Sequence, residues 1–241
     1  MSPHLDDAIL SCEALVAREE PLDIVTVFAG APEPPQQGWW DTRTGFANSE
    51  ESVAARRRED EAAFAGTPHR RTYLDLLELQ HTPTRTAGDR ETIARAITDW
   101  LSRNPGGTIA LPAGAGCSQA LMARWLRRLR REDCWPPHVD HLNVRNVVLE
   151  ALRGSGGTPL LYEELPYLFG GPADREAEKA AAAGGWRTEP VSIEIDRAQK
   201  VTRVAAYVSQ IPHISPDEGR LDDPRVLPPV ERYWLLRRTS A

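Results

Sequence analysis

Histidine and aspartate residues gather in two short motifs that lie far apart in the chain. The first is an H-x-D-D unit with His4, Asp6 and Asp7, and the second is an H-x-D-H unit that runs from His138 to His141. Neutral imidazole and carboxylate suit zinc, and a catalytic zinc site uses three protein ligands and one position for water. Either motif alone is usually a helix cap or a solvated loop. Two such motifs, each after a proline and each followed by an apolar helical pattern, indicate a metal-dependent hydrolase.

The spacing within the motifs suggests which side chains share a metal ion. His4 and Asp7 are three residues apart, so a turn that enters a helix can aim both at one point and leave Asp6 on a different side. His141 would complete the ligand triad from across a sheet. Two histidines and one carboxylate also suit ferrous iron. The residues therefore predict a metal site, with Zn2+ as the expected ion and Fe2+ or another divalent ion as the alternative.

Both motifs resemble the signatures of a known family. Ser2-Pro-His-Leu-Asp-Asp-Ala-Ile-Leu-Ser11 and His138-Val-Asp-His-Leu-Asn-Val-Arg145 look like the two signature motifs of the PIG-L/LmbE-like deacetylases. That family contains zinc-dependent enzymes that remove N-acetyl groups from amino sugars and glycoconjugates, and related amidases. Four lesser segments resemble further family blocks in the same order: residues 25–30, 55–60, 162–167 and 206–210.

The resemblance implies a role for each remaining residue of the motifs. Asp6, adjacent to the ligand Asp7 but pointing elsewhere, is implied as the general base. His138 would face the oxyanion of the tetrahedral intermediate and stabilise it. Asp140 would hydrogen-bond the His138 ring and set its tautomer, a role that carboxylates often fill around such sites. Amide hydrolysis needs a water that is deprotonated near neutrality, and zinc lowers the pKa of its bound water to about 7.

Two adjacent tryptophans are candidates for contact with the substrate. Trp39 and Trp40 lie in the Pro- and Gly-rich segment 30–49, and a loop of that length inside a compact domain is usually functional or disordered. The pair either pins a long loop to the body of the protein or stacks on a sugar or an aromatic aglycone.

Further substrate-binding candidates follow predicted strands and helices. The predicted helix 50–65 is charged and mostly has the pattern of a solvated face, but the resemblance places an arginine of its Arg56-Arg-Arg58 run near the substrate. The resemblance does not decide firmly among the three, and Arg57 is our candidate. Asp75 or Glu78 lies at the carboxyl end of a predicted strand, where open α/β sheets bind ligands; Glu78 is our candidate. Tyr167, in a Glu-Leu-Pro-Tyr loop, borders the predicted pocket.

Predicted strands alternate with predicted helices along the chain. This order predicts an α/β fold with a doubly wound, Rossmann-like, mostly parallel sheet and helices on both faces. Residues 188–195 alternate between apolar and polar side chains and predict an antiparallel edge strand. The other predicted strands are 22–29, 70–76, 108–112, 159–165 and 232–236, and the main predicted helices are 7–18, 50–65, 89–103, 141–152, 173–184 and 197–208.

We expect residues 1–241 to form a single domain of this family, with two departures from its pattern. Only Met1-Ser-Pro precedes His4, whereas the family has a strand there, so we favour a missing upstream segment over an unanchored first ligand. Residues 117–136 form an insertion between the glycine turn 113–116 and the second motif. Its helical apolar pattern, interleaved with arginines, predicts either a plain surface helix or, more attractively, a pocket wall or lid.

Composition limits the classes of partner. The formal charge is −6, with 29 basic and 35 acidic residues and no long basic tract, so nucleic acid is not an expected partner. Cys12, Cys117 and Cys134 have neither C-x-x-C spacing nor an even count, which fits reduced thiols in a cytoplasm. No apolar run approaches the length of a membrane span and no signal peptide precedes the first motif. We therefore expect a cytoplasmic protein with a small-molecule substrate, and a homo-oligomer stays open.

Three functions compete on these grounds. The leading hypothesis is a metal-dependent hydrolase that removes an N-acetyl group from an amino sugar within a glycoconjugate or natural product. The second is an amidase that cleaves a bulkier N-acyl group. The third is a non-catalytic module that binds metal or sugar, and the presence of all six proposed site residues argues against it.

Overall fold

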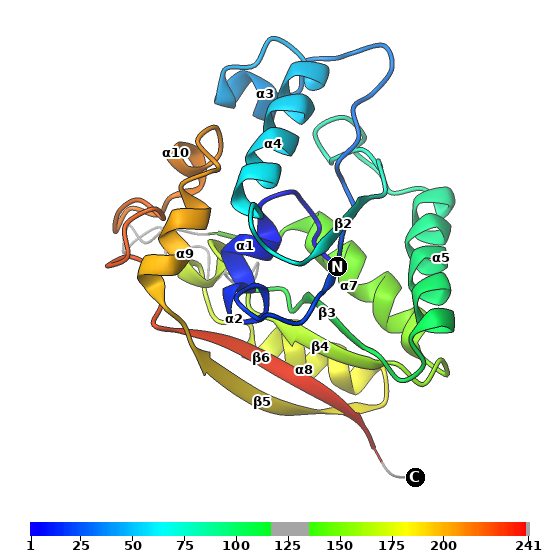
Figure 1. Cartoon of the computed structure of the whole chain (residues 1–241). Coiled ribbons are helices and arrows are strands. Elements are labelled where there is room, and N and C mark those ends of the chain that lie inside the picture. Colours follow the sequence, from blue (N-terminus) through cyan, green and yellow to red (C-terminus); the bar gives the residue numbers. More distant parts are fainter. Residues whose placement is uncertain (117–134, 240–241) are drawn as a thin grey trace, which may run out of the picture. The chain divides into compact units, whose positions relative to one another are not determined.

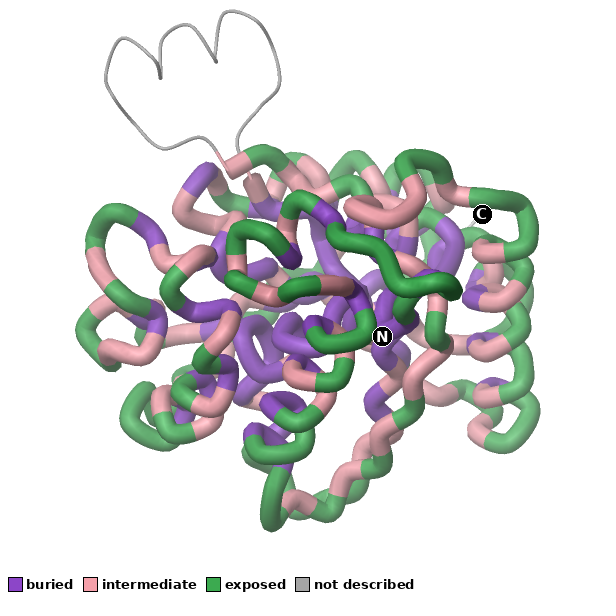
Figure 2. The backbone as a smooth tube through the Cα atoms, turned by 90° about the horizontal axis from the view of Figure 1, so that it is seen from above, coloured by how far each residue is buried: buried purple, intermediate pink, exposed green. Residues whose placement is uncertain are grey.

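The structure, a computed structural model, describes residues 1–116 and 135–239 (Figure 1). All but two residues of the predicted insertion 117–136 therefore lie outside the described residues, and so do Cys117 and Cys134. Buried and exposed residues alternate along most elements (Figure 2), as expected for helices and strands with one face on a core. No helix among the described residues is both long enough and apolar enough to cross a membrane.

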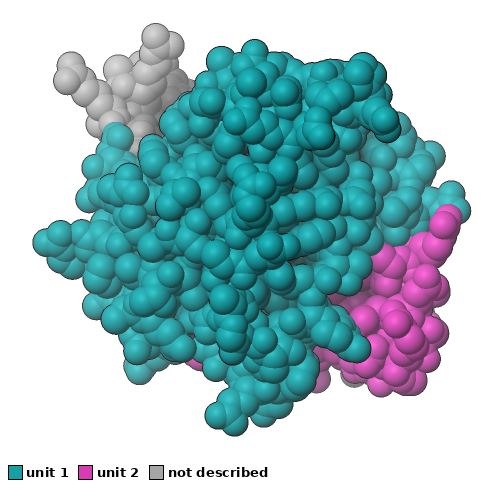
Figure 3. Space-filling model, turned by 45° about the horizontal axis from the view of Figure 1, so that its top comes forward, with its two compact units in different colours: residues 1–93, 194–230 teal, residues 94–193, 231–241 magenta. Residues whose placement is uncertain are grey.

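The chain divides into two compact units, which are coloured separately in Figure 3. Unit 1 comprises Met1–Ile93 and Glu194–Val230, and unit 2 comprises Ala94–Ile193 and Glu231–Ala241. The chain passes from unit 1 to unit 2 within helix α5 (Ala87–Arg103). The predicted first motif belongs to unit 1, and the predicted second motif belongs to unit 2.

Unit 1 is built on parallel pairing near the N-terminus. Strand β1 (Asp23–Thr26) pairs in parallel with β2 (Arg70–Tyr73). Ser2 forms a parallel bridge to Thr26, in which its N–H donates to Val25 O at 2.8 Å. The segment that carries His4 is therefore held against β1 by main-chain hydrogen bonds.

Our prediction of one helix over residues 7–18 is wrong in one respect, because the helix is interrupted. The structure has α1 (Asp7–Ser11) and α2 (Glu13–Val16), and Cys12 between them has φ −136° and ψ 31°. Helix α9 (Arg197–Val204) packs against α1. From α9 the buried Lys200 donates its Nζ to Leu10 O at 2.5 Å, which satisfies a carbonyl at the end of the short α1.

Helix α4 (Ser49–Ala63) has a polar buried face, so our prediction of a mostly solvated face is wrong. Its buried residues are Ser49, Ser52, Arg56, Glu59, Asp60 and Ala63. Buried polar groups are stable only when they have partners. Glu59 accepts hydrogen bonds from the N–H and Oγ of Ser209 at 2.7 and 2.8 Å. Asp60 accepts from Tyr73 Oη at 2.9 Å and from Arg71 at 3.0 Å.

The other helices of unit 1 flank this core. Helix α3 (Trp39–Thr44) lies in the segment 30–49 that we predicted as a loop, and α10 (Ile211–Ile214) follows α9. Neither helix shows an apolar period in the sequence long enough to be recognised. Both are short, so they depend on contacts with the rest of unit 1.

Unit 2 contains a four-stranded sheet in the order β3 (Thr108–Pro112), β4 (Thr158–Tyr162), β6 (Val230–Arg238), β5 (Trp186–Glu194). β3 and β4 are parallel, and β4 and β6 are antiparallel. The strand predicted at 188–195 therefore lies at the edge of this sheet, as expected. Helix α7 (Val139–Leu152) packs on β3 and β4 through Val144, Val148 and Leu152, which are fully buried at four-residue spacing. Helix α8 (Asp174–Ala183) and the 3-10 turn η1 (Tyr167–Phe169) complete the unit.

The N-terminus of α4 gives a prediction, because this helix carries Arg56. Asn48 is in extended conformation and its Oδ1 accepts the Glu51 N–H at 3.0 Å. We expect Asn48→Ala to lower the free energy of unfolding by about 1 kcal/mol, because a main-chain donor loses its cap. Urea denaturation measures the change, and Asn48→Asp is the control that keeps the acceptor. An unchanged urea midpoint in Asn48→Ala would show that this cap does not stabilise α4.

Candidate functional site

His4 and Asp7 lie together at the start of α1, as their spacing predicts. The His4 N–H donates to Asp7 Oδ2 at 2.8 Å, and His4 Nδ1 lies 3.4 Å from the same oxygen. Asp7 is in the first turn of α1, where exposed amides and the helix dipole favour negative charge. Both side chains are buried. An imidazole nitrogen and a carboxylate oxygen are therefore presented side by side, which is the donor chemistry of a metal ligand pair.

The side chain of Asp6 lies near Arg56, whereas that of Asp7 lies near His4. Its Oδ1 lies 3.9 Å from Arg56 Nη2. Burial, followed by the negative charge of Asp7, raises the pKa of Asp6 to about 6, while Arg56 and His4 act in the opposite direction. A carboxyl group with a pKa near neutrality is suited to accept and return a proton.

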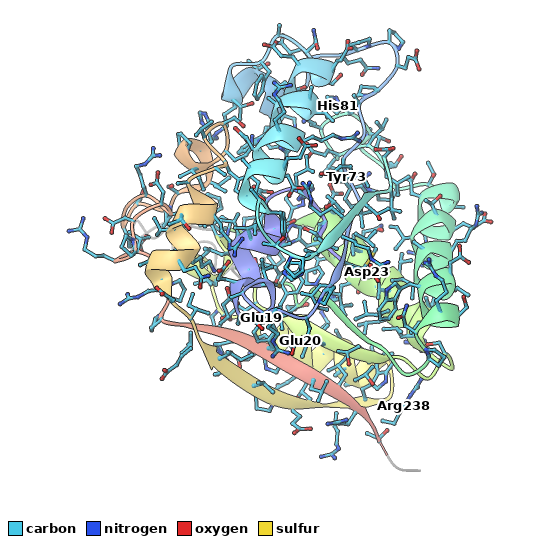
Figure 4. The ribbon with its side chains drawn as sticks, in the orientation of Figure 1. Glu19, Glu20, Asp23, Tyr73, His81 and Arg238 are labelled. Atoms are coloured by element: carbon cyan, nitrogen blue, oxygen red, sulfur yellow. The ribbon has the colours of Figure 1, made fainter. Side chains whose placement is uncertain are left out.

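Arg56 and Arg57 have different environments. Arg56 is buried and forms an ion pair with Glu78, so both lie beside Asp6. Arg57 instead pairs with Asp75 and donates to Ala29 O at 2.8 Å. Its guanidinium stacks 4.7 Å from the ring centroid of Tyr73, a residue labelled in Figure 4. The arginine that approaches Asp6 is thus Arg56. The side chain of our substrate-binding candidate Arg57 instead contacts residues at the end of β2, and its role stays a prediction.

The two tryptophans of α3 differ in exposure. The Trp40 Nε1–H donates to Gln210 Oε1 at 2.8 Å, and its ring lies edge-on to His213 with centroids 6.2 Å apart. Trp39 is 60% exposed and packs edge-on against Trp40, with centroids 5.5 Å apart. Trp40 therefore anchors α3 within unit 1. The indole of Trp39 is accessible, and its stacking on a substrate stays a prediction.

In unit 2, His138 is the N-cap of α7. Its backbone is extended, with φ −71° and ψ 134°, and its Nδ1 accepts the Asp140 N–H at 3.2 Å. A neutral imidazole that accepts at Nδ1 carries its proton on Nε2, so Nε2–H can donate to an oxyanion. This contact comes from the main chain of Asp140; the hydrogen bond from its carboxylate to the ring stays a prediction. Asp140 is fully buried.

His141 occupies the first turn of the same helix and is fully buried. Its Nδ1 lies 3.4 Å from Glu164 Oε1. The ring centroids of His138 and His141 are 5.2 Å apart. The ring of Tyr167 lies 5.0 Å from that of His141 and 5.9 Å from that of His138. Tyr167 therefore borders the histidine pair, and its place at a substrate pocket stays a prediction.

Glu164 is a site residue that the sequence analysis missed. Its carboxylate accepts the N–H groups of Ala113, Gly114 and Ala115 at 3.2, 2.9 and 3.0 Å. Three successive amides of this kind form an anion-binding nest. Gly114 has φ +97°, and a Cβ there would lie 2.8 Å from Arg145 Nη1, so glycine is required. The anion held by this glycine turn is the carboxylate of Glu164. About 50 residues separate the two segments, so no local pattern links them.

Each unit therefore brings together one part of the predicted residue set. Unit 1 groups His4 with Asp7, and Asp6 with Arg56 and Glu78. Unit 2 groups His138, His141 and Tyr167 with the main chain of Asp140.

Comparisons with known proteins were made for sequence and for fold. No family model matches the chain. The 2'-N-acetylparomamine deacetylase of Streptomyces fradiae is 27% identical over 227 residues, which cover 87% of this chain and 72% of that protein. A triple mutant of a deacetylase of the teicoplanin biosynthetic pathway matches with a TM-score of 0.69 and 24% identity over 99% of this chain and 97% of the other. The zinc-inhibited form of teicoplanin deacetylase matches with a TM-score of 0.66 and 22% identity, over 99% and 97% of the two chains.

A third solved structure agrees with these. The deacetylase of the A40926 pseudoaglycone matches with a TM-score of 0.66 and 24% identity, over 100% of this chain and 96% of the other. The predicted α/β fold, with a mostly parallel sheet and an antiparallel edge, is thereby confirmed.

The contact between Glu164 and the glycine turn gives a second prediction. We expect Glu164→Gln to lower the free energy of unfolding by about 1–3 kcal/mol, because a neutral amide oxygen accepts more weakly than a carboxylate and the new NH2 group cannot accept the Gly114 N–H. Thermal or urea unfolding measures the change. Glu178→Gln, on the exposed surface of α8, is the matched control. Equal stability of Glu164→Gln and the control would mean that the nest does not need the charge.

Proposed function

We infer that the chain is a deacetylase of the PIG-L/LmbE-like family, the family that its two signature motifs predict. We propose that it hydrolyses the N-acetyl amide of an amino sugar carried by a larger natural product. The observation that carries this proposal is the alignment of 87% of the chain with 2'-N-acetylparomamine deacetylase. The similar folds of deacetylases for teicoplanin and for the A40926 pseudoaglycone support a natural-product substrate.

We propose that His4, Asp7 and His141 hold one divalent ion. The paired donor atoms of His4 and Asp7, 3.4 Å apart, support this assignment. The carboxylate of Glu164 beside His141 Nδ1 also supports it, because metal-binding histidines are commonly oriented by a carboxylate on the other ring nitrogen. A divalent ion held there would supply an acidified water and polarise the amide carbonyl. Two imidazoles and one carboxylate fit zinc, and also ferrous iron.

Asp6 and His138 would carry out the proton transfer and the charge stabilisation. Asp6, buried and with its pKa raised to about 6 by burial and by Asp7, would take a proton from the attacking water and return it to the leaving amine. His138, with its proton on Nε2, would donate a hydrogen bond to the oxygen that becomes negative. Such a donor is typically worth about 3–4 kcal/mol in the transition state. The Asp140 N–H at Nδ1 keeps the ring in that tautomer.

The proposed substrate contacts involve residues around these groups. Trp39, exposed on α3, would stack on a sugar or an aglycone ring, since such faces pack well on indole. Tyr167 would border the acyl end, beside the two histidines. Glu78 pairs with Arg56, so we propose that it acts through that arginine, while Arg57 would contact the substrate directly.

Metal analysis coupled to amine release tests the proposed function. Protein stripped by a chelator should regain activity with one divalent ion per chain, and zinc, Fe2+ and Co2+ should be compared because zinc inhibits a deacetylase of similar fold. The substrates are 2'-N-acetylparomamine and N-acetylglucosamine, each also with a longer acyl group. We expect His4→Ala and His141→Ala to lose the ion, and His213→Ala, the matched histidine control, to keep it. Absence of amine release from every acetyl substrate, or full metal content in both variants, would refute the proposal.

Substitution of the two neighbouring aspartates should distinguish the general base from the metal ligand. We expect Asp6→Asn to keep its metal and lose about 10²–10⁴-fold in kcat, the usual contribution of general acid–base catalysis. Asp7→Asn should lose metal affinity as well, because a neutral amide oxygen is a weaker ligand than a carboxylate. Metal titration and kcat on both variants measure the difference. Equal loss of metal in the two would reject this division of roles.

A further inference from the structure

A chain of partly buried and buried polar contacts in unit 1 begins at the N-terminus of α3. The side-chain carbonyl of Gln80 accepts the N–H groups of Trp40 and Asp41 at 3.1 and 3.3 Å. These amides belong to the first turn of α3, where main-chain donors have no partner within the helix. The N-cap residue is Gly38, which has no side chain to satisfy them. Gln80, some 40 residues away, provides the cap instead.

The amide nitrogen of the same side chain is linked to Asp6 through two further residues, Glu78 and Arg56. Gln80 Nε2 donates to Glu78 Oε2 at 2.9 Å and to Asp41 Oδ1 at 3.3 Å. The other oxygen of Glu78 pairs with Arg56, whose Nη2 lies 3.9 Å from Asp6 Oδ1. Glu78, Arg56 and Asp6 are all buried. Contacts in a water-poor environment are stronger than at the surface, and a missing partner is costly, so these side chains hold one another in place.

Gly38 provides independent evidence that Gln80 is closely fitted. A Cβ at position 38 would lie 2.2 Å from Gln80 Oε1 and 2.8 Å from its Cδ. Both distances are far below van der Waals contact. The backbone of Gly38 has φ −84°, which any residue can adopt. A side chain at position 38 would therefore displace the end of the Gln80 side chain from its present place.

We propose that Gln80 is a positioning residue that couples the tryptophan pair of α3 to the general base Asp6. The inference rests on the proposed function, in which Asp6 moves the proton and Trp39 contacts the substrate. One side-chain amide fixes α3 through its oxygen and fixes Glu78, and hence Arg56, through its nitrogen. A substrate that contacts Trp39 would therefore affect the position of the Asp6 carboxylate as well as its own affinity.

The kinetic test uses two variants that break this link in different ways. Gln80→Leu keeps similar volume and removes the amide, and Gly38→Ala displaces an intact Gln80. For N-acetylglucosamine, we expect both to lower kcat by between about 10- and 10²-fold, as small misplacements of catalytic groups do. For 2'-N-acetylparomamine, KM should rise as well. Trp39→Ala should raise KM for the larger substrate, because it removes the proposed stacking surface. The matched control is Gln37→Leu, because Gln37 is exposed and its side chain donates to Phe46 O at 2.9 Å, away from Gln80 and Glu78.

Hydrogen exchange of the Trp40 and Asp41 amides provides a readout that does not depend on activity. Exchange should rise in Gln80→Leu and Gly38→Ala and stay unchanged in Gln37→Leu. Glu78→Asp, which keeps the charge but shortens the side chain, should also raise it, because Glu78 acts on α3 through Gln80. Unchanged exchange in Glu78→Asp, or faster exchange in Gln80→Leu with an unchanged kcat for N-acetylglucosamine, would overturn the coupling. Wild-type protein that hydrolyses neither substrate would instead refute the proposed function, while the exchange data would still test the contact chain.

Discussion

Main-chain N–H groups at the starts of helices are the constraint on which the candidate site depends. Every buried amide needs an acceptor, and the acceptors here are site residues or their neighbours. Asp7 accepts the His4 N–H and His138 accepts the Asp140 N–H. Gln80 caps α3, and Glu164 accepts from the glycine turn. The geometry of these side chains is thereby fixed by hydrogen bonds to helix starts and, for Glu164, to the turn that follows β3.

Burial of charge is the second constraint, and it explains the chemistry available to Asp6. A carboxylate beside another carboxylate in a water-poor environment resists ionisation, which is why burial and Asp7 raise the pKa of Asp6 to about 6. The nearby guanidinium of Arg56 limits the rise and is itself held by Glu78. Arg56 is therefore stable in the interior only as part of a group of charges. An exposed Asp6 would have an ordinary acidity and would be a weaker base.

Local patterns predicted much of the fold and failed at identifiable places. Apolar periods located most helices and strands, including α7 and the antiparallel edge strand. The single helix expected over residues 7–18 is interrupted at Cys12, and α4 buries a polar face. Helix α3 is too short to show an apolar period, and its first turn is satisfied by a glutamine from a distant segment. Propensity and periodicity describe neighbours in sequence, and each of these features depends on partners far along the chain.

The sequence by itself identified the residues that can bind a metal ion and transfer protons. Its two motifs indicated, by their resemblance to a family, the reaction to expect. The spacing of His4 and Asp7 was enough to place them together, because three residues return to the same side of a turn. Tertiary structure decided the rest. It selected Arg56 over Arg57 as the neighbour of Asp6, gave the anchoring role to Trp40, and revealed Glu164 and Gln80. These four assignments depend on contacts between segments that are distant in sequence, and only the folded chain brings such segments within hydrogen-bonding distance.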